Sequence, residues 1–277
     1  MKDTQKKSNL SKKQRDVIVA VIVNAVSLLT VIAWLRSGMS ADVDSTQQWF
    51  SKNAEALDHF IKEGDDAGLD ALLHHASQWH YMDAQQWTAF AMHHTRMLLG
   101  SPAGAVDNRT LDVLELGCGT GGYIRAARRH WLPRARFTGI DLNLESIAIA
   151  RRVVPDATFL LGDLRDMRFL RDASFDAVVA PGSIGYVRDL RDVRHALREV
   201  VRVLRPGGVF MASVFGLPGD EGRLGSFRIT ATKEWWPEAA PGLSGWKFEG
   251  MTGWDGCNCE HRQRHRYAVA ARRDDRN

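Results

Sequence analysis

The chain has 277 residues, of which 44% are hydrophobic and 25% charged, so it can bury one sizeable core plus an accessory region. Its three cysteines are too few for a disulfide framework and favour a reducing compartment. The net charge of +4 lies in residues 1–16, which carry six Lys or Arg and two Asp, while the remainder holds 31 basic and 31 acidic residues. This distribution argues against a broadly cationic face for nucleic acid.

The basic tail at residues 1–16 precedes an uncharged apolar run. Residues 17–35 contain no charged side chain, are apolar on all sides of a helix and end beside Trp34. A run of 19 residues is long enough to cross a bilayer. A cleaved signal peptide and a buried core helix are the alternatives, but a signal core usually has about 7 to 15 residues. We predict a single N-terminal membrane anchor over residues 17–36.

Residues 41–105 show helical rather than strand spacing, with apolar side chains recurring at three and four. We predict a helical cap over this range. This segment is rich in histidine, but the histidines lack a recognised ligand spacing, so we predict no metal there. They are His59, His74, His75, His80, His93 and His94.

A glycine loop follows the cap. Residues 113–123 read VLELGCGTGGY, in which an apolar strand leads to Gly117, Gly119 and Gly122 at the start of a helix. Glycine lets the backbone turn sharply and approach a ligand, and the last one lets the helix pack close to the strand. Alone, this pattern also fits dinucleotide oxidoreductases and ordinary turns.

The segments after the loop repeat the pattern of a strand followed by a turn. Strand 136–141 ends at Asp141, near the 20-residue spacing at which a carboxylate meets ribose hydroxyls. Strand 157–164 ends at Asp163-Leu164, and strand 174–183 enters a Pro-Gly turn. Residues 197–210 contain the turn Leu-Arg-Pro-Gly-Gly. Acids therefore lie at the ends of three successive strands, counting Glu115.

This series resembles the class I S-adenosylmethionine (SAM) dependent methyltransferases over residues 110–216. The resemblance implies an α/β, Rossmann-like, seven-stranded and mostly parallel sheet with helices on both faces and an antiparallel last strand. It implies SAM as cofactor, residues 106–277 as the SAM-binding methyltransferase domain, and the cap at residues 41–105 as the region that selects the substrate. The final hairpin is expected at residues 246–254 and 264–272.

The resemblance also implies a set of cofactor contacts. The loop N–H groups suit the SAM carboxylate, Glu115 the loop or the amino group, and Asp141 the ribose hydroxyls. Asp163 would accept from the adenine amino group. For each acid, a helix N-cap or a solvated strand end is the alternative. The expected set is Glu115, Gly117, Cys118, Gly119, Gly122, Asp141, Leu142, Asp163, Leu164, Ala180 and Tyr81.

Methyl transfer requires mainly alignment and exclusion of water, with a general base only where the acceptor must lose a proton. The candidate bases are Ser183, Tyr186, His80 and His94, and none has a diagnostic spacing. Residues 180–183 read APGS, not the Asn/Asp-Pro-Pro-aromatic motif that related enzymes use to hold a nucleobase amine. We predict methylation at O, N or C of a small or membrane-partitioned molecule.

Two other functions stay open: a nicotinamide-dependent oxidoreductase and a membrane-tethered protein that binds SAM without catalysis. Membrane orientation is also open. Basic residues before the span favour a cytoplasmic N-terminus, whereas a SAM enzyme suits a catalytic domain facing the cytosol.

Two further clusters have ordinary explanations. Arg191, Arg194, Arg198, Arg202 and Arg205 fall on one predicted helix face, which is typical of a solvated face but could also touch phosphates or an anionic membrane. A second cluster matches no standard zinc spacing, so no metal is predicted. It comprises Cys257, Cys259, His261 and His265.

Overall fold

The computed structural model describes residues 40–69, 72, 110–130, 132–187, 189–217, 220–225, 230–251 and 266–274. The basic tail, the predicted anchor at 17–36 and most of the predicted cap lie outside these residues. Within them, no helix combines the length and apolarity needed to span a membrane.

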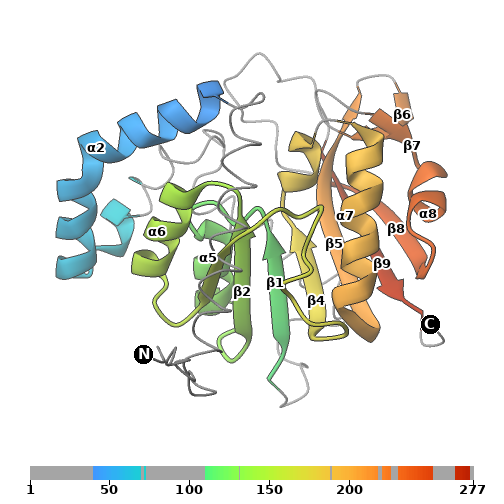
Figure 1. Cartoon of the computed structure of the whole chain (residues 1–277), viewed down its shortest axis with the longest axis horizontal. Coiled ribbons are helices and arrows are strands. Elements are labelled where there is room, and N and C mark those ends of the chain that lie inside the picture. The colour runs from blue at the N-terminus through green and yellow to red at the C-terminus, as the bar shows by residue number, and fades with distance from the viewer. Residues whose placement is uncertain are drawn as a thin grey trace, which may run out of the picture. The chain divides into compact units, whose positions relative to one another are not determined.

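Five parallel strands form the centre of the sheet, in the order β3-β2-β1-β4-β5 (Figure 1). Their bounds are β1 Asp112–Leu116, β2 Arg136–Asp141, β3 Thr158–Leu161, β4 Phe175–Ala180 and β5 Leu204–Leu217. Strand β9 (Arg266–Arg273) pairs antiparallel with β5, and β8 (Leu243–Met251) pairs antiparallel with β9. Strand β8 therefore runs in the direction of β5, and β9 is the one reversed strand of this seven-stranded path. The predicted mostly parallel sheet and its final hairpin are confirmed.

Two short strands were not predicted. Strand β6 (Asp220–Gly225) pairs with the carboxyl end of β5, and β7 (Thr230–Thr232) pairs with β6, both antiparallel. They extend the sheet where β5 continues beyond its pairing with β9.

Helices cover both faces of the sheet. Helices α5 (Gly122–His130) and α6 (Leu144–Val153) pack on one face, and α7 (Leu190–Val203) and α8 (Trp235–Ala239) pack on the other. Alternation along β1 explains the two layers, because Val113 faces the α5–α6 side whereas Leu114 and Leu116 face the α7 side. On α7 the residues buried against the sheet recur at three and four: Val193, Ala196, Leu197, Val200 and Val203.

The described part of the predicted cap docks on α5 and α6. Helix α2 (Ser40–Glu63) belongs from Thr46 onward to the same compact unit as the sheet. Leu57 and Leu69 pack with Ile149 of α6, and Asp66 pairs with both Arg125 and Arg129 of α5. A small apolar cluster and ion pairs thus attach this segment to the sheet's outer helices.

An ion-pair network joins the strands at the opposite end from the glycine loop. Asp112 binds Arg136 at 2.7 Å and Arg205 at 2.9 Å, and Arg205 also binds Asp176 at 2.6 Å. Placing Arg205 on the arginine face of the preceding helix was wrong: α7 ends at Val203 and Arg205 lies in β5. Pro206 is incompatible with a continuing helix at this point, and the two carboxylates fix Arg205 instead.

Candidate functional site

The candidate site lies where the carboxyl ends of β1, β2, β3 and β4 meet. The chain order runs outward from β1 through β2 to β3 on one side and from β4 to β5 on the other. Ligands of open α/β sheets bind at such a reversal of strand order, beyond the carboxyl ends of the strands. The glycine loop follows β1 at this position.

The glycine loop has left-handed backbone geometry at three positions, and the first two have different surroundings. Gly117 has φ +67°, and a Cβ built there would lie 2.3 Å from Cβ of Ser183. Gly119 has φ +51°, and a Cβ there would meet no atom within 4 Å. Gly117 therefore permits close approach to the end of β4, whereas Gly119 borders open space. A third glycine, Gly121 (φ +83°), was overlooked although it follows the other two in the same run; it lets the loop approach Phe159 and Ala150.

Asp141 ties the glycine loop to the end of β2. Its carboxylate accepts hydrogen bonds from the backbone N–H of Gly119 and of Asn143, both at 2.8 Å. Burial raises the pKa of Asp141, and bonds from the Asn143, Gly119 and Leu142 backbone oppose that rise. Each carboxylate oxygen can accept a further hydrogen bond. Leu142, next along the chain, is half-buried.

Glu115 presents an unusual buried carboxyl beneath the loop. Its side chain is 3% exposed, and its Oε2 has no hydrogen-bond partner among the described residues; the same holds for the hydroxyl of Tyr123. Burial, followed by the charge of Asp141, raises the pKa of Glu115 well above its usual range. Burial also raises the pKa of Tyr123. A buried polar atom without a partner is costly, so a ligand that brings a donor or a cation would be favoured here.

Asp163 lies two residues beyond β3 and already has a strong partner. The Arg165 guanidinium binds its carboxylate at 2.6 Å and reaches Asp192 of α7 at 2.9 Å. The prediction included Asp163 and the buried Leu164 but overlooked Arg165, although it is only two residues away. No local signal could have identified Asp192 as the second partner.

The candidate bases are only partly brought to this edge. The Ser183 hydroxyl donates to the carbonyl of Leu116 at 2.5 Å, so its proton joins the end of β1 to the 3-10 turn Ser183–Tyr186. This contact gives Ser183 a structural role. Of Tyr186, the structure describes the backbone only. His80, His94 and Tyr81 lie outside the described residues.

Two other predicted contact residues are buried. Cys118 is a free cysteine, and burial raises the pKa of its thiol well above the usual range; Ala180 ends β4 with no exposed surface. Within the described ranges, no three or more His, Cys, Asp or Glu side chains gather in a way that could hold a metal ion. The Cys257–His265 cluster lies outside those ranges.

Comparison with known proteins agrees with this geometry. A protein-family model described as "Methyltransferase domain" matches residues 113–208. The fatty-acid O-methyltransferase of Mycolicibacterium smegmatis is 40% identical over 116 residues, 41% of this chain and 40% of that protein. The demethylmenaquinone methyltransferase of Chlorobaculum tepidum is 40% identical over 97 residues, 35% of this chain and 37% of that protein. The matches therefore span about two fifths of these curated relatives' length.

A solved structure shares the fold. The Haemonchus contortus N-methyltransferase in complex with phosphomonomethylethanolamine and S-adenosylhomocysteine superposes with a TM-score of 0.50 at 16% identity. The superposition covers 69% of this chain and 57% of that one. At this identity the likeness concerns the fold alone.

Proposed function

Because residues 113–208 form a class I SAM-dependent methyltransferase domain, we propose that the protein transfers the methyl group of SAM to a small or lipid-like acceptor. The observation that carries this proposal is the pair of acids, Glu115 and Asp141, beside a glycine loop that is open at Gly119. The N–H groups of Cys118, Gly119 and Gly121 already have acceptors, so an anion would meet the N–H groups of the first turn of helix α5 and the positive end of its dipole.

The chemistry of these groups fits SAM. The N–H groups at the start of α5 would hold its carboxylate, and the unpartnered Glu115 Oε2 would accept from its ammonium. Asp141, already positioned by Gly119 and Asn143, would accept from the ribose hydroxyls, and Leu142 would cover one face of the adenine. The Asp163 carboxylate would accept from the adenine amino group, and the Leu164 N–H would donate to a ring nitrogen.

SAM supplies a methyl group already activated by its sulfonium. The protein's task is therefore to align the acceptor and exclude water, which in well-oriented systems is worth roughly 7–11 kcal/mol of barrier. Because the Ser183 hydroxyl donates to the carbonyl of Leu116, a role for Ser183 as general base would require this hydrogen bond to break. We propose in-line transfer to O, N or C.

A lipid-like acceptor is supported by the relatives, whose names specify fatty acid and demethylmenaquinone. The predicted anchor at residues 17–36 would raise the local concentration of an acceptor dissolved in the membrane. We propose that the catalytic domain faces the cytosol, where SAM is made, although the six basic residues before the span favour the opposite orientation.

Calorimetry on the full chain in detergent tests the proposal, with SAM, NAD and NADP as ligands. We expect SAM to bind and the two nicotinamide nucleotides not to bind. Asp141→Ala should lower SAM affinity by about 10- to 100-fold, because it removes acceptors for the ribose. The matched control Asp156→Ala, at an exposed acid, should leave the affinity unchanged.

Turnover separates an enzyme from a protein that only binds SAM. Transfer of a labelled methyl group to fatty acid or quinone in lipid vesicles would support the proposal. Tight SAM binding with no transfer to any acceptor would favour the non-catalytic alternative, and preferred binding of NAD would favour the oxidoreductase.

A further inference from the structure

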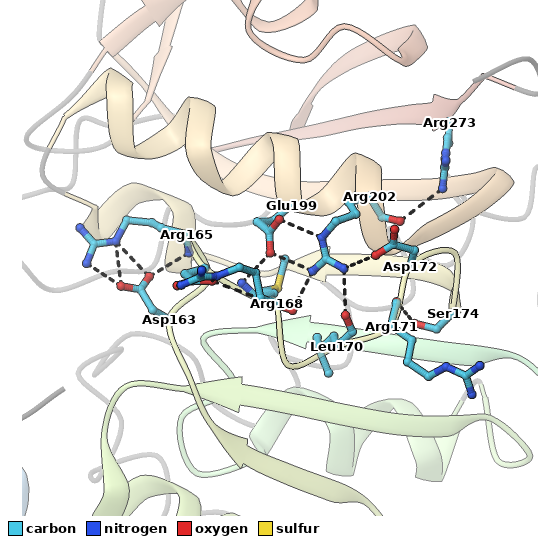
Figure 2. Close-up of polar contacts among 12 residues, drawn as sticks. Asp163, Arg165, Arg168, Leu170, Arg171, Asp172, Ser174, Glu199, Arg202 and Arg273 are labelled. Carbon is cyan, nitrogen blue, oxygen red and sulfur yellow. Dashed lines mark hydrogen bonds and ion pairs between the residues drawn. The ribbon is translucent and has the colours of Figure 1, made fainter. Parts of the chain in front are cut away.

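The segment between β3 and β4 is attached to helix α7 by two separate polar clusters. The first joins Asp163, Arg165 and Asp192, and the second centres on Glu199 and Arg202. Figure 2 shows the Asp163–Arg165 pair of the first cluster and the contacts of Glu199 and Arg202 in the second. The two clusters hold different parts of the segment: one holds a side chain and the other holds the backbone.

The second cluster fixes the path of the main chain. Glu199 accepts from the N–H of Met167 at 2.6 Å, and Arg202 donates to the carbonyls of Met167 at 2.7 Å and Leu170 at 2.8 Å. Arg202 also binds Asp172 at 2.5 Å. Hydrogen bonds between charged side chains and backbone are among the stronger ones in proteins. The backbone is thus held at Met167 and Leu170 by contacts in which Arg165 takes no part.

The first cluster fixes one carboxylate. Arg165 donates to Asp163 from its backbone N–H at 2.8 Å and from Nη2 at 2.6 Å, while its Nε lies 2.9 Å from each carboxylate oxygen. Its Nη1 donates to Asp192 at 2.9 Å. The side chains of Arg165, Asp163 and Asp192 are only 12%, 23% and 9% exposed, so this is not a loose surface pair. Arg165 is therefore anchored at α7 and determines how the Asp163 carboxylate is turned.

We propose that Arg165 is a positioning residue for adenine, which aims the Asp163 carboxylate at the exocyclic amino group of the cofactor. The inference rests on the proposed function, since it requires SAM at the carboxyl edge of the sheet. A carboxylate offers about four acceptor sites, and Arg165 fills about three of them, because its four contacts come from three N–H groups and the Nε–H is shared between the two oxygens; one site remains for an amino group. An ionised carboxylate cannot donate, so the site should reject a 6-oxo purine, whose oxygen would face it.

A nearby ion pair offers a matched control. Arg168 donates to the Asp166 carboxylate from Nε at 2.7 Å and from Nη2 at 2.6 Å, with the same two-residue spacing. Its side chain is 84% exposed, and none of its hydrogen bonds in the described structure reaches α7. Arg168→Gln therefore removes a similar local pair without disturbing Asp163. Arg202→Gln supplies the opposite comparison, because it loosens the backbone of the segment.

The experiment measures how the full chain binds S-adenosylhomocysteine and its 6-oxo counterpart, S-inosylhomocysteine, by calorimetry. We expect wild type to prefer the amino compound by at least about tenfold. Arg165→Gln should lose most of that preference by weakening the amino compound alone, and Arg165→Lys should recover only part, because it keeps the charge but not the fork. Arg168→Gln should match wild type, and Arg202→Gln should weaken both ligands alike.

Each other outcome has a distinct meaning. Equal losses for both ligands in Arg165→Gln would make Arg165 a structural residue and overturn the inference. An unchanged preference in that variant, or no preference in wild type, would overturn it too. If wild type bound neither S-adenosylhomocysteine nor S-inosylhomocysteine, the result would instead count against the proposed function. Circular dichroism of each variant verifies that it is folded.

Discussion

Replacing Gly117 with alanine should damage the fold more than the same change at Gly119. An alanine held near φ +67° costs about 1–2 kcal/mol for its left-handed backbone. At Gly117 the new Cβ also meets Ser183, with Cβ at 2.3 Å and Oγ at 3.0 Å. Ser183 cannot rotate away, because the nearer atom is its own Cβ and its hydroxyl is bonded to Leu116. Overpacking of this kind adds about 1–3 kcal/mol, so the unfolding free energy should fall by about 2–5 kcal/mol.

The matched substitution Gly119→Ala carries the backbone cost alone, about 1–2 kcal/mol, because its Cβ enters open space. The same open space is where the cofactor should approach, so this variant should lose SAM affinity despite being the more stable of the two. Urea unfolding of the full chain, followed by tryptophan fluorescence, measures the stability difference, with the m-value as a test that the unfolded state is unchanged.

A double-mutant cycle isolates the clash. Combining Gly117→Ala with Ser183→Gly should be less harmful than the sum of the two changes, with a coupling energy of at least about 1 kcal/mol. Ser183→Ala serves as the control, because it removes the hydroxyl but keeps the clashing Cβ. Equal stability losses at Gly117 and Gly119, or additive effects in the cycle, would refute the steric explanation.

Three further predictions concern charge. Without cofactor, the unfolding free energy of Glu115→Gln should increase relative to that of wild type as the pH rises above 4.5. The pKa of Glu115 is raised in the folded state, so ionising this carboxyl destabilises the wild-type fold. A difference in urea unfolding that does not change with pH would contradict this. Asp112→Asn should show the opposite pH dependence, because hydrogen bonding to Arg136 lowers the pKa of Asp112. We expect the variant to be less stable than wild type by about 1 kcal/mol near neutral pH and equally stable in acid. A loss of stability that persists in acid would contradict this. Asp66→Asn should lower the unfolding free energy by about 1 kcal/mol, because it weakens the ion pair with Arg125, whose side chain is only 9% exposed. Limited proteolysis should then cleave residues 64–69 more readily. An unchanged cleavage pattern would show that apolar packing alone holds this segment.

The sheet and the places of its acids could be predicted because their signals are local. Apolar strands with an acid at or just beyond the end, namely Glu115, Asp141 and Asp163, indicate both the strands and the edge at which they meet. The hydrogen-bond partners of these acids could not be predicted in the same way. Asp192 reaches Arg165 only once α7 has packed on the sheet, and no local pattern encodes that approach.

The surroundings of two predicted residues depend on strand pairing. Ser183 is a candidate base by its place after the fourth strand, and the neighbouring positions of β1 and β4 put it against Gly117 and Leu116, where its hydroxyl donates to the Leu116 carbonyl. Arg205 continued a helical spacing that the chain had already left at Val203, and strand pairing placed it between Asp112 and Asp176. Periodicity indicates which residues face alike but not where an element ends.

Strand β9 lies next to β5 in the sheet although it is synthesised after β6, β7 and β8. Strand β5 has β4 on one side, but from Val209 to Phe215 its other side is closed by β9, the last of the described strands to leave the ribosome. Until then that side of a nascent β5 presents unpaired N–H and C=O groups, which can template pairing with another chain. We expect a ribosome-stalled chain ending before Arg266 to need a chaperone to stay soluble, and its release to coincide with closure of the sheet.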